Sequence, residues 1–416
     1  MTRDALLAAG VLFATFTQLR PFGVPLGPGE LCLAAWLCLT LGRNISSLLP
    51  IPPALLRLLV FWLLFSAALC IGTVMAVIVG ERNVKAYFIH DVIAYALVAG
   101  ISLLAVFQVN APVRLRRTAW LLVLLGSCFA TVQLSQAYAL LPTAGVDVWF
   151  YDRFIGWSSN ANQVGLLCLI LVLLSLHLAE TSSRPVARLA AIASGVVPVW
   201  AGLLSRSDAF LAALILSVCC IAGVRWWRWL VLPRRRTGIA DLSALLVVFA
   251  VPALVVATAP LAYRLAAEVL ALEARGLTNQ KLERDVGGRA KLWEQALERG
   301  LESRMLGLGP GPHLVRPAEL REPRWDWLPD FEAHNTFVDV FLQGGLLATA
   351  GLLWLLGTAA RTAARANFSC LLALVLALSG FALTHFIMRH PIVWFAMALV
   401  LAAGTPFRQR AMGAGG

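Results

Sequence analysis

The histidine of the segment AHNTFVDVFLQGGLL has the neighbours that a general base needs. His334 stands where a charged segment meets an apolar run, and Asn335 and Asp339, four residues apart, share one helical face. A neutral imidazole near pH 7 is the most natural acceptor for the proton of a hydroxyl nucleophile. A polar cap at a helix start explains the same residues, so both interpretations stay open here. The pair Gly344 and Gly345 would let another helix approach closely.

A short connection between two apolar runs contains an arginine that membrane topology does not explain. Ser205, Arg206, Ser207 and Asp208 form the whole connection, on the side of the membrane where positive charge is sparse. A guanidinium stays charged and binds phosphate oxygens in pairs, so Arg206 is a candidate ligand for an anion. The alternative is a tight hairpin whose arginine reaches the lipid headgroups.

Two further polar groups lie at the ends of apolar runs. The segment FIMRHP contains Arg389 and His390, which are either interfacial anchors or further ligands of the same anion. In GWSSNANQVG, Asn160 and Asn162 open an apolar run just after Arg153. Such a polar helix start suits capping or the binding of an anion.

The cysteines and the other histidines do not form a recognisable metal motif. All eight cysteines lie inside apolar runs without ligand-like spacing, which indicates small buried side chains rather than disulfides. His90, His177, His313 and His385 are more typical of structural positions. The outer face has no Asp-x-Asp pair near the candidate arginines. We therefore expect no metal and no cofactor.

The elements that position these residues must be membrane-spanning helices. The 416 residues are 60% hydrophobic and 13% charged, the mean hydropathy is +0.79, and apolar runs of about 20 residues recur throughout. This composition excludes a soluble globular domain, a disordered chain and a disulfide-rich secreted protein. We expect an all-α polytopic membrane protein with about twelve transmembrane helices, at 4–20, 28–42, 54–80, 85–108, 118–138, 162–180, 187–204, 208–224, 242–263, 335–358, 367–388 and 391–405.

The positive charge follows the topology of this bundle. The net charge is +12, and 31 of the 34 basic residues are arginine. Every second connection is rich in arginine, from Arg43 to Arg408 and Arg410, which predicts that both termini are cytoplasmic. The excess charge therefore indicates orientation in a membrane and no nucleic-acid partner.

One long segment interrupts the pattern of apolar runs. Residues 264–335 contain twelve of the 22 acidic residues and eleven basic ones, and the topology makes this segment an outer loop between helices 9 and 10. We expect three parts: helices 1–9 in 1–263, the loop domain 264–335, and helices 10–12 with a short cytoplasmic tail in 336–416. Within the loop, the spacing predicts an amphipathic helix over 289–301 with an apolar face of Ala290, Leu292, Trp293, Ala296 and Leu297.

The order of these motifs resembles the O-antigen ligase superfamily, which also contains O-antigen polymerases and protein O-oligosaccharyltransferases. The resemblance covers about residues 155–360. The motifs are N-x-N (Asn160, Asn162), S-R-S (Ser205, Arg206, Ser207), G-R-x-x-x-W (Gly288, Arg289, Trp293), G-x-G-P (Gly307, Gly309, Pro310) and H-N-(x)8-G-G (His334, Asn335, Gly344, Gly345). Many members have proline where this chain has Ala161, and glycine where it has Ser207.

The resemblance implies a C-type glycosyltransferase-like bundle in the bacterial inner membrane, with a metal-independent, inverting active site facing the periplasm. Such a ligase transfers a polysaccharide from undecaprenyl diphosphate to lipid A–core oligosaccharide. The catalytic histidine of the family matches His334, and its phosphate-binding arginines match Arg206 and Arg289. Arg389 is a further candidate by position. Secondary candidates for the site are Asn335, Ser205, Asn160, Asn162, His390 and Trp293.

Three other functions remain as alternatives. A polymerase would join repeat units, and a protein O-oligosaccharyltransferase would modify a pilin-like acceptor. We favour the ligase because one outer loop dominates and the chain has no C-terminal extension for a protein acceptor. A transporter or flippase would predict an internal half-repeat and charges at the midplane, neither of which the sequence contains.

Overall fold

The apolar runs fold as helices because a helix pairs its own backbone N–H and C=O groups in a medium without water. The computed structural model describes residues 2–21, 26–44, 51–81, 85–143, 145–231, 277–315 and 330–403. The helices are α1 (Thr2–Phe13), η1 (Thr17–Leu19), α2 (Pro28–Asn44), α3 (Pro53–Ile78), α4 (Lys85–Val106), α5 (Ala111–Ala137), α6 (Ala161–Thr181), α7 (Pro185–Leu204), α8 (Asp208–Val231), α10 (Leu277–Glu302), α11 (Thr336–Arg365), α12 (Ser369–Ala382) and α13 (Pro391–Ala403).

Seven of the described helices are long and apolar enough to cross a membrane: α3, α4, α5, α6, α7, α8 and α11. Two shorter apolar helices, α12 and α13, accompany them. The expectation of an all-α polytopic membrane protein is confirmed. The total of twelve spanning helices and the placement of the large loop stay predictions, because the expected helix 242–263 lies outside the described residues.

Two helices are shorter than the apolar runs from which they were predicted. The chain leaves α1 at Phe13 and continues into η1, although one helix was expected over 4–20. The chain leaves α12 at Ala382 rather than at 388, and the following loop contacts Thr336, whose Oγ1 donates to the carbonyl of His385 (2.6 Å). The loop continues with the apolar residues Phe386, Ile387 and Met388, so hydropathy alone could not locate the helix end.

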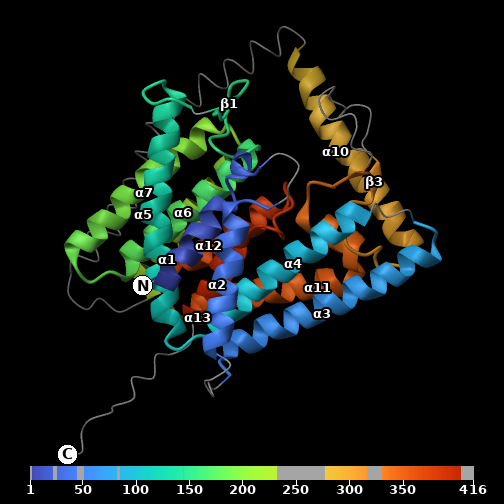
Figure 1. The fold of residues 1–416 in the computed structure, drawn as a ribbon, viewed down its shortest axis with the longest axis horizontal. Helices are drawn as coiled ribbons and strands as arrows, with labels where there is room; N and C mark the ends of the chain where they lie inside the picture. The colour runs from blue at the N-terminus through green and yellow to red at the C-terminus, as the bar shows by residue number, and fades with distance from the viewer. Residues whose placement is uncertain are drawn as a thin grey trace, which may run out of the picture.

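The shortest apolar helix lies at the centre of the bundle. Every residue from Pro391 to Ala402 of α13 is buried, and α13 packs against α4, α11 and α5 (Figure 1). A helix that is hydrophobic on all sides can face lipid or lie in the core of a bundle, and the burial of α13 shows that it lies in the core. The loop that precedes α13, with Arg389 and His390, is therefore fixed by the core.

α11 is broken at Gly345, where φ is 63° and ψ is −160°. The break frees backbone groups, which pair with the loop 305–309. These bonds run from Leu308 N to Leu342 O (2.7 Å), from Gly309 N to Gln343 O (2.8 Å) and from Leu346 N to Met305 O (3.0 Å). A Cβ on Gly344 would lie 3.2 Å from Cβ of Ala68 in α3, which confirms the close helix approach expected at the glycine pair.

The amphipathic helix α10 begins at Leu277, twelve residues before the predicted start. Leu292 and Ala296 are buried, and they form a small apolar cluster with residues around the start of α11. The predicted apolar face was wrong in part, since Trp293 is 44% and Leu297 62% exposed. The buried residues of α10 are spaced four apart, at Leu292, Ala296 and Gly300, so its buried face is narrower than the predicted apolar face.

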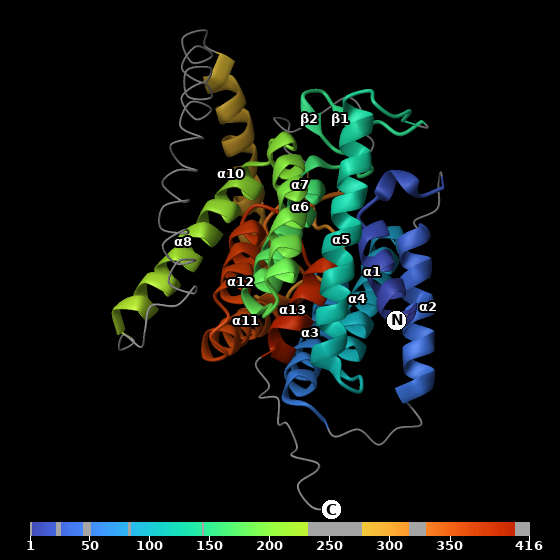
Figure 2. The ribbon, with the colours of Figure 1, turned by 90° about the vertical axis from the view of Figure 1, so that its left-hand side faces the viewer.

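The two ends of the bundle differ in their polar contacts. Successive helices alternate in direction, so the starts of α3, α5 and α7 meet the ends of α6, α8 and α11. At this end, five arginines each donate a hydrogen bond to a polar group: Arg57 to Thr362, Arg114 to Asp4, Arg116 to Thr181, Arg188 to Ser182 and Arg228 to Asn367. The opposite end carries α10 and the antiparallel pair β1 (Trp149–Phe150) and β2 (Arg153–Phe154) (Figure 2). A second antiparallel pair, β3 (Leu314–Val315) and β4 (Asp330–Phe331), precedes α11.

Candidate functional site

His334 lies in the turn between β4 and α11. Its backbone has φ 53°, a left-handed conformation that is uncommon for residues other than glycine. The imidazole is partly buried, and its ring centroid lies 4.7 Å from that of Phe331 in an edge-on contact. The predicted base therefore occupies a defined position at the start of α11.

Asn335 is the N-cap of α11, as the capping interpretation of this segment predicts. Its side-chain oxygen accepts from the backbone N–H groups of Phe337 (3.0 Å) and Val338 (3.4 Å), which begins α11. The carboxylate of Asp339 is also engaged, because it accepts from the N–H groups of Ala333 (2.8 Å) and Asn335 (3.3 Å). Asn335 therefore caps α11, whereas Asp339 bonds the turn that presents His334.

α10 contacts this turn through Trp293. The indole N–H donates to the carbonyl of Ala333, the residue before His334, at 3.3 Å. Arg289 precedes Trp293 by one helical turn on the same helix, while its side chain lies outside the described part of the structure. The G-R-x-x-x-W motif thus lies on the helix that touches the histidine segment.

Arg389 lies in an ion-pair network between three segments. Its guanidinium pairs with Asp91 of α4 (2.5 Å) and with Glu332, two residues before His334, and it lies 4.8 Å from the ring centroid of Phe386. Burial disfavours its charge, but the carboxylates of Glu332 and Asp91 outweigh burial and raise the pKa of Arg389 above its ordinary value. Two carboxylates already balance this arginine.

His390 follows Arg389 and stays neutral over the physiological range. Its burial, together with the positive charges of Arg389 and Arg20, lowers the pKa of His390 to about 4. An uncharged imidazole adds nothing to the binding of an anion by charge. The structure therefore favours a packing role for His390.

Arg206 lies in the turn between α7 and α8, with φ 47°. Its guanidinium pairs with Asp152 of the β1–β2 hairpin, and both side chains are more than 60% exposed. Ser205 is fully buried, and its hydroxyl donates back to the carbonyl of Gly202 (2.6 Å). Arg206 is accessible from outside the bundle, whereas Ser205 ends α7.

The asparagines of the N-x-N motif hold the start of α6. The side-chain oxygen of Asn160 accepts from the N–H of Asn162 (2.8 Å) and caps the helix. Arg153 donates to the side chain of Asn162 (2.9 Å) and to the carbonyl of Ser205 (3.1 Å). Arg153 therefore ties the hairpin, α6 and the Arg206 turn together, a role that the sequence reasoning missed although Arg153 stands beside the motif.

Asp91 and Glu332 were also missed as members of the site. The signal for Asp91 was a carboxylate within an apolar run, next to His90, whose Nδ1 lies 3.0 Å from the Asp91 carboxylate. Asp91 is 1% exposed, and such a carboxylate requires a partner, which Arg389 provides. Nothing in the sequence connects it to residue 389.

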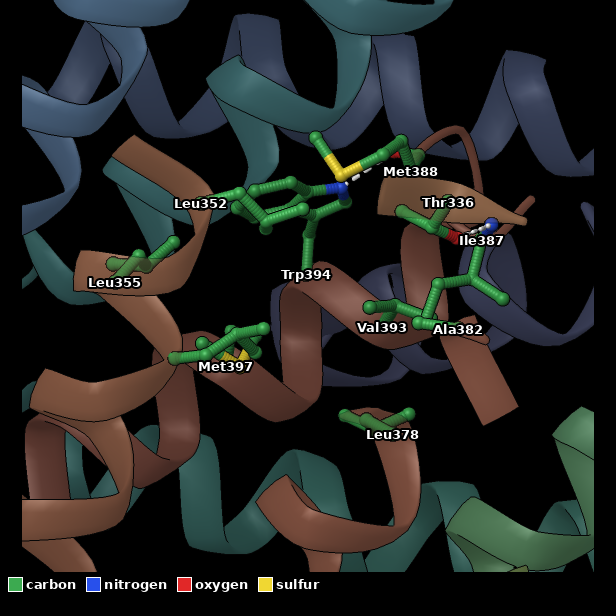
Figure 3. A pocket seen from close by; sticks show the side chains of 11 residues that line it. Thr336, Leu352, Leu355, Leu378, Ala382, Ile387, Met388, Val393, Trp394 and Met397 are labelled. Carbon is green, nitrogen blue, oxygen red and sulfur yellow. Dashed lines mark hydrogen bonds between the residues drawn. The ribbon is translucent and has the colours of Figure 1, made fainter. Parts of the chain in front are cut away.

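A small cavity lies beneath the α12–α13 loop, between α11, α12 and α13 (Figure 3). Its volume is about 30 Å³, and apolar side chains such as Leu378, Val393 and Trp394 line it. Figure 3 shows Thr336 at its edge, accepting from the N–H of Ile387 (3.0 Å). A space of this size holds two or three water molecules at most, at about 10–15 Å³ each, and no sugar or lipid chain.

Within the described residues, no group of three or more His, Cys, Asp or Glu side chains could hold a metal ion. The polar side chains described above are suited to acid–base and electrostatic chemistry. His334 can exchange a proton, and Arg206 can bind an anion from the aqueous side.

These features define a class: a polytopic helical membrane protein with an imidazole and accessible guanidinium at the same end of the bundle. Residues 189–353 match the family model described as O-Antigen ligase, which confirms the resemblance to the O-antigen ligase superfamily. The matched segment includes Arg206, Arg289, Trp293 and His334, whereas Arg389 lies outside it. Among the curated proteins, no sequence matches the chain. The family match supports a ligase- or polymerase-type function.

Proposed function

We propose that the protein is an O-antigen ligase, which transfers a polysaccharide from undecaprenyl diphosphate to lipid A–core oligosaccharide. The observation that carries this proposal is the position of His334 within the matched segment, on the strained turn before α11 and at the same end as Arg206. In this proposal the reaction takes place at the periplasmic face of the bacterial inner membrane, because the opposite end holds the arginines typical of a cytoplasmic face.

In the proposed mechanism, His334 takes the proton of the acceptor hydroxyl while that oxygen attacks the anomeric carbon. The bond from this carbon to the diphosphate breaks, undecaprenyl diphosphate leaves, and attack from the opposite side inverts the anomeric centre. Arg206 and Arg289 stabilise the charge that develops on the diphosphate, so the proposal needs no metal and no cofactor. A positioned base of this kind contributes about 10²–10⁴-fold in rate.

The structure favours a different role for Arg389 from the one that its position suggested. Binding a diphosphate would require Arg389 to compete with Glu332 and Asp91 for its donors. We assign Arg389 to holding Glu332, and with it the segment that leads to His334. Asn160, Asn162 and Ser205 have structural roles through the hydrogen bonds described above, and His390 packs as a neutral side chain.

The test is transfer by the purified protein in detergent with three acceptors: lipid A–core, a second lipid-linked repeat unit, and a pilin. The ligase proposal expects transfer to lipid A–core alone. Transfer to the repeat unit or to the pilin would instead assign a polymerase or a protein O-oligosaccharyltransferase. Because detergent solution holds no gradient or compartments, transfer of any kind excludes a transporter or flippase as the sole function.

A further inference from the structure

The backbone at His334 needs support from its surroundings. A left-handed conformation is unfavourable for a residue with a Cβ, so it persists only where neighbouring contacts fix it. Asn335 supports the helix that follows, since its bonds go forward to Phe337 and Val338. The support for His334 itself must come from other groups.

Two side chains from different helices bond the peptide groups on both sides of His334. The Asp339 carboxylate accepts from the N–H of Ala333 (2.8 Å) and from the N–H of Asn335 (3.3 Å). The Trp293 indole donates to the carbonyl of Ala333 (3.3 Å). The backbone before and after His334 is thereby fixed from α11 on one side and from α10 on the other.

These contacts exceed what helix capping or core packing requires. The bond from Asn335 N to Asp339 resembles a capping box, but the shorter bond, from Ala333 N, lies outside the helix and stabilises no helix end. Asp339 is 3% exposed and each of its oxygens already accepts a backbone N–H, so it is placed to hold this turn rather than to contact a substrate. Trp293 is 44% exposed, which is more than a core residue would show.

We propose that Asp339 and Trp293 are positioning residues: they hold His334 in the orientation in which its imidazole accepts the proton of the acceptor hydroxyl. This inference rests on the proposed function. Trp293 has a second effect, because it fixes α10 relative to the histidine turn. The backbone of α10 one helical turn earlier, which carries Arg289, is then held against the same turn, so that proton transfer and charge stabilisation act on the same substrate.

The first experiment compares Trp293→Phe with Trp149→Phe. Both substitutions keep an aromatic ring and remove one indole-to-carbonyl hydrogen bond, since Trp149 donates to the Ala137 carbonyl (3.1 Å) away from His334. A displacement of about 1 Å at a reacting group can cost roughly 10²-fold in rate. We expect Trp293→Phe and Asp339→Asn to lower kcat about 10- to 100-fold, with KM for the lipid-linked donor within about twofold of wild type. Trp149→Phe should leave both unchanged.

The thermal midpoint separates positioning from a general loss of structure. We expect Trp293→Phe and Trp149→Phe to lower Tm by similar small amounts, while only the former lowers kcat. If kcat of Trp293→Phe equals that of Trp149→Phe, the positioning role is refuted. Because Asp339→Asn removes a buried acceptor and could fail to fold, the result for Trp293→Phe decides the question alone.

A second readout does not depend on transfer. The rate at which diethyl pyrocarbonate modifies His334, followed by mass spectrometry, reports the environment of the imidazole, and His90, 48% exposed, serves as the internal reference. We expect Trp293→Phe to change the rate at His334 at least threefold and to leave His90 unchanged. An unchanged His334 rate overturns the inference. If wild type transfers to no acceptor, the proposed function fails, and this readout still tests whether Trp293 fixes His334.

Discussion

A methyl group at Gly345 should destabilise the protein severely, because the break in α11 depends on the absence of a side chain there. A Cβ at this position would lie 2.2 Å from the carbonyl oxygen of Met305 and 2.6 Å from the carbonyl carbon of Leu306. The backbone angles are also ones that essentially only glycine adopts. Gly345→Ala must therefore both strain the backbone and push away the loop 305–309.

The size of the effect follows from the contacts that would be lost. Forcing alanine into this conformation costs about 1–3 kcal/mol. Expelling the loop would break three backbone hydrogen bonds to α11, worth about 1 kcal/mol each. The total is about 4–6 kcal/mol. At roughly 1–2 °C per kcal/mol for a chain of this length, the thermal midpoint should fall by roughly 5–10 °C.

Gly357→Ala is the matched control, with the same substitution on the same helix. A Cβ at Gly357 would meet no atom within 4 Å, so alanine should stabilise the helix by about 0.5–1 kcal/mol. The assay is thermal unfolding of both purified variants in detergent, followed by tryptophan fluorescence. If Gly345→Ala melts at or above the temperature of Gly357→Ala, the broken helix and its loop contacts are refuted.

Three further predictions concern charge. The pKa of His390 is about 4 in the folded state and 6.5 ordinarily, so between these values the unfolded chain binds one more proton and stability falls as the pH drops from 6.5 to 4. His390→Gln should therefore reduce the dependence of Tm on pH in this range. A pH profile of Tm equal to that of wild type would contradict the buried, neutral state of His390. Asp152→Asn removes the counter-ion of Arg206, so the guanidinium no longer has to give up this ion pair when it binds the donor. KM for the lipid-linked donor should fall by up to about fivefold, since an exposed ion pair contributes at most about 1 kcal/mol. A raised KM would show instead that Asp152 helps to bind the donor. Arg206→Lys keeps the charge but loses the planar fork and should reduce transfer at least tenfold, whereas Arg228→Lys at the opposite end should not; equal activities would make Arg206 a mere anchor.

Hydropathy predicted where helices lie because each spanning helix needs a long apolar run. It failed where apolar residues are buried without being helical, as at Phe386, Ile387 and Met388 in the loop after α12. The side-chain pattern of α10 predicted a helix but assigned Trp293 and Leu297 to its buried face. Burial there depends on which face meets α11, and that is decided by tertiary packing rather than by periodicity.

The site was predictable where its residues are close in sequence. The motif around His334 and the turn around Arg206 were found because their polar residues interrupt apolar runs. The network of Asp91, Glu332 and Arg389 was not found, because 298 residues separate Asp91 from its partner Arg389. Ion pairs across that distance follow from how helices pack, and one sequence carries no direct record of that packing.

The proposed reaction depends on His334 as the base in glycan transfer. The most direct measurement is the rate of transfer from the lipid-linked donor to lipid A–core by purified wild type and His334→Ala, with donor binding measured on the same samples. We expect His334→Ala to lose about 10²–10⁴-fold in rate and to retain its affinity for the donor. Transfer by His334→Ala at the wild-type rate would contradict it.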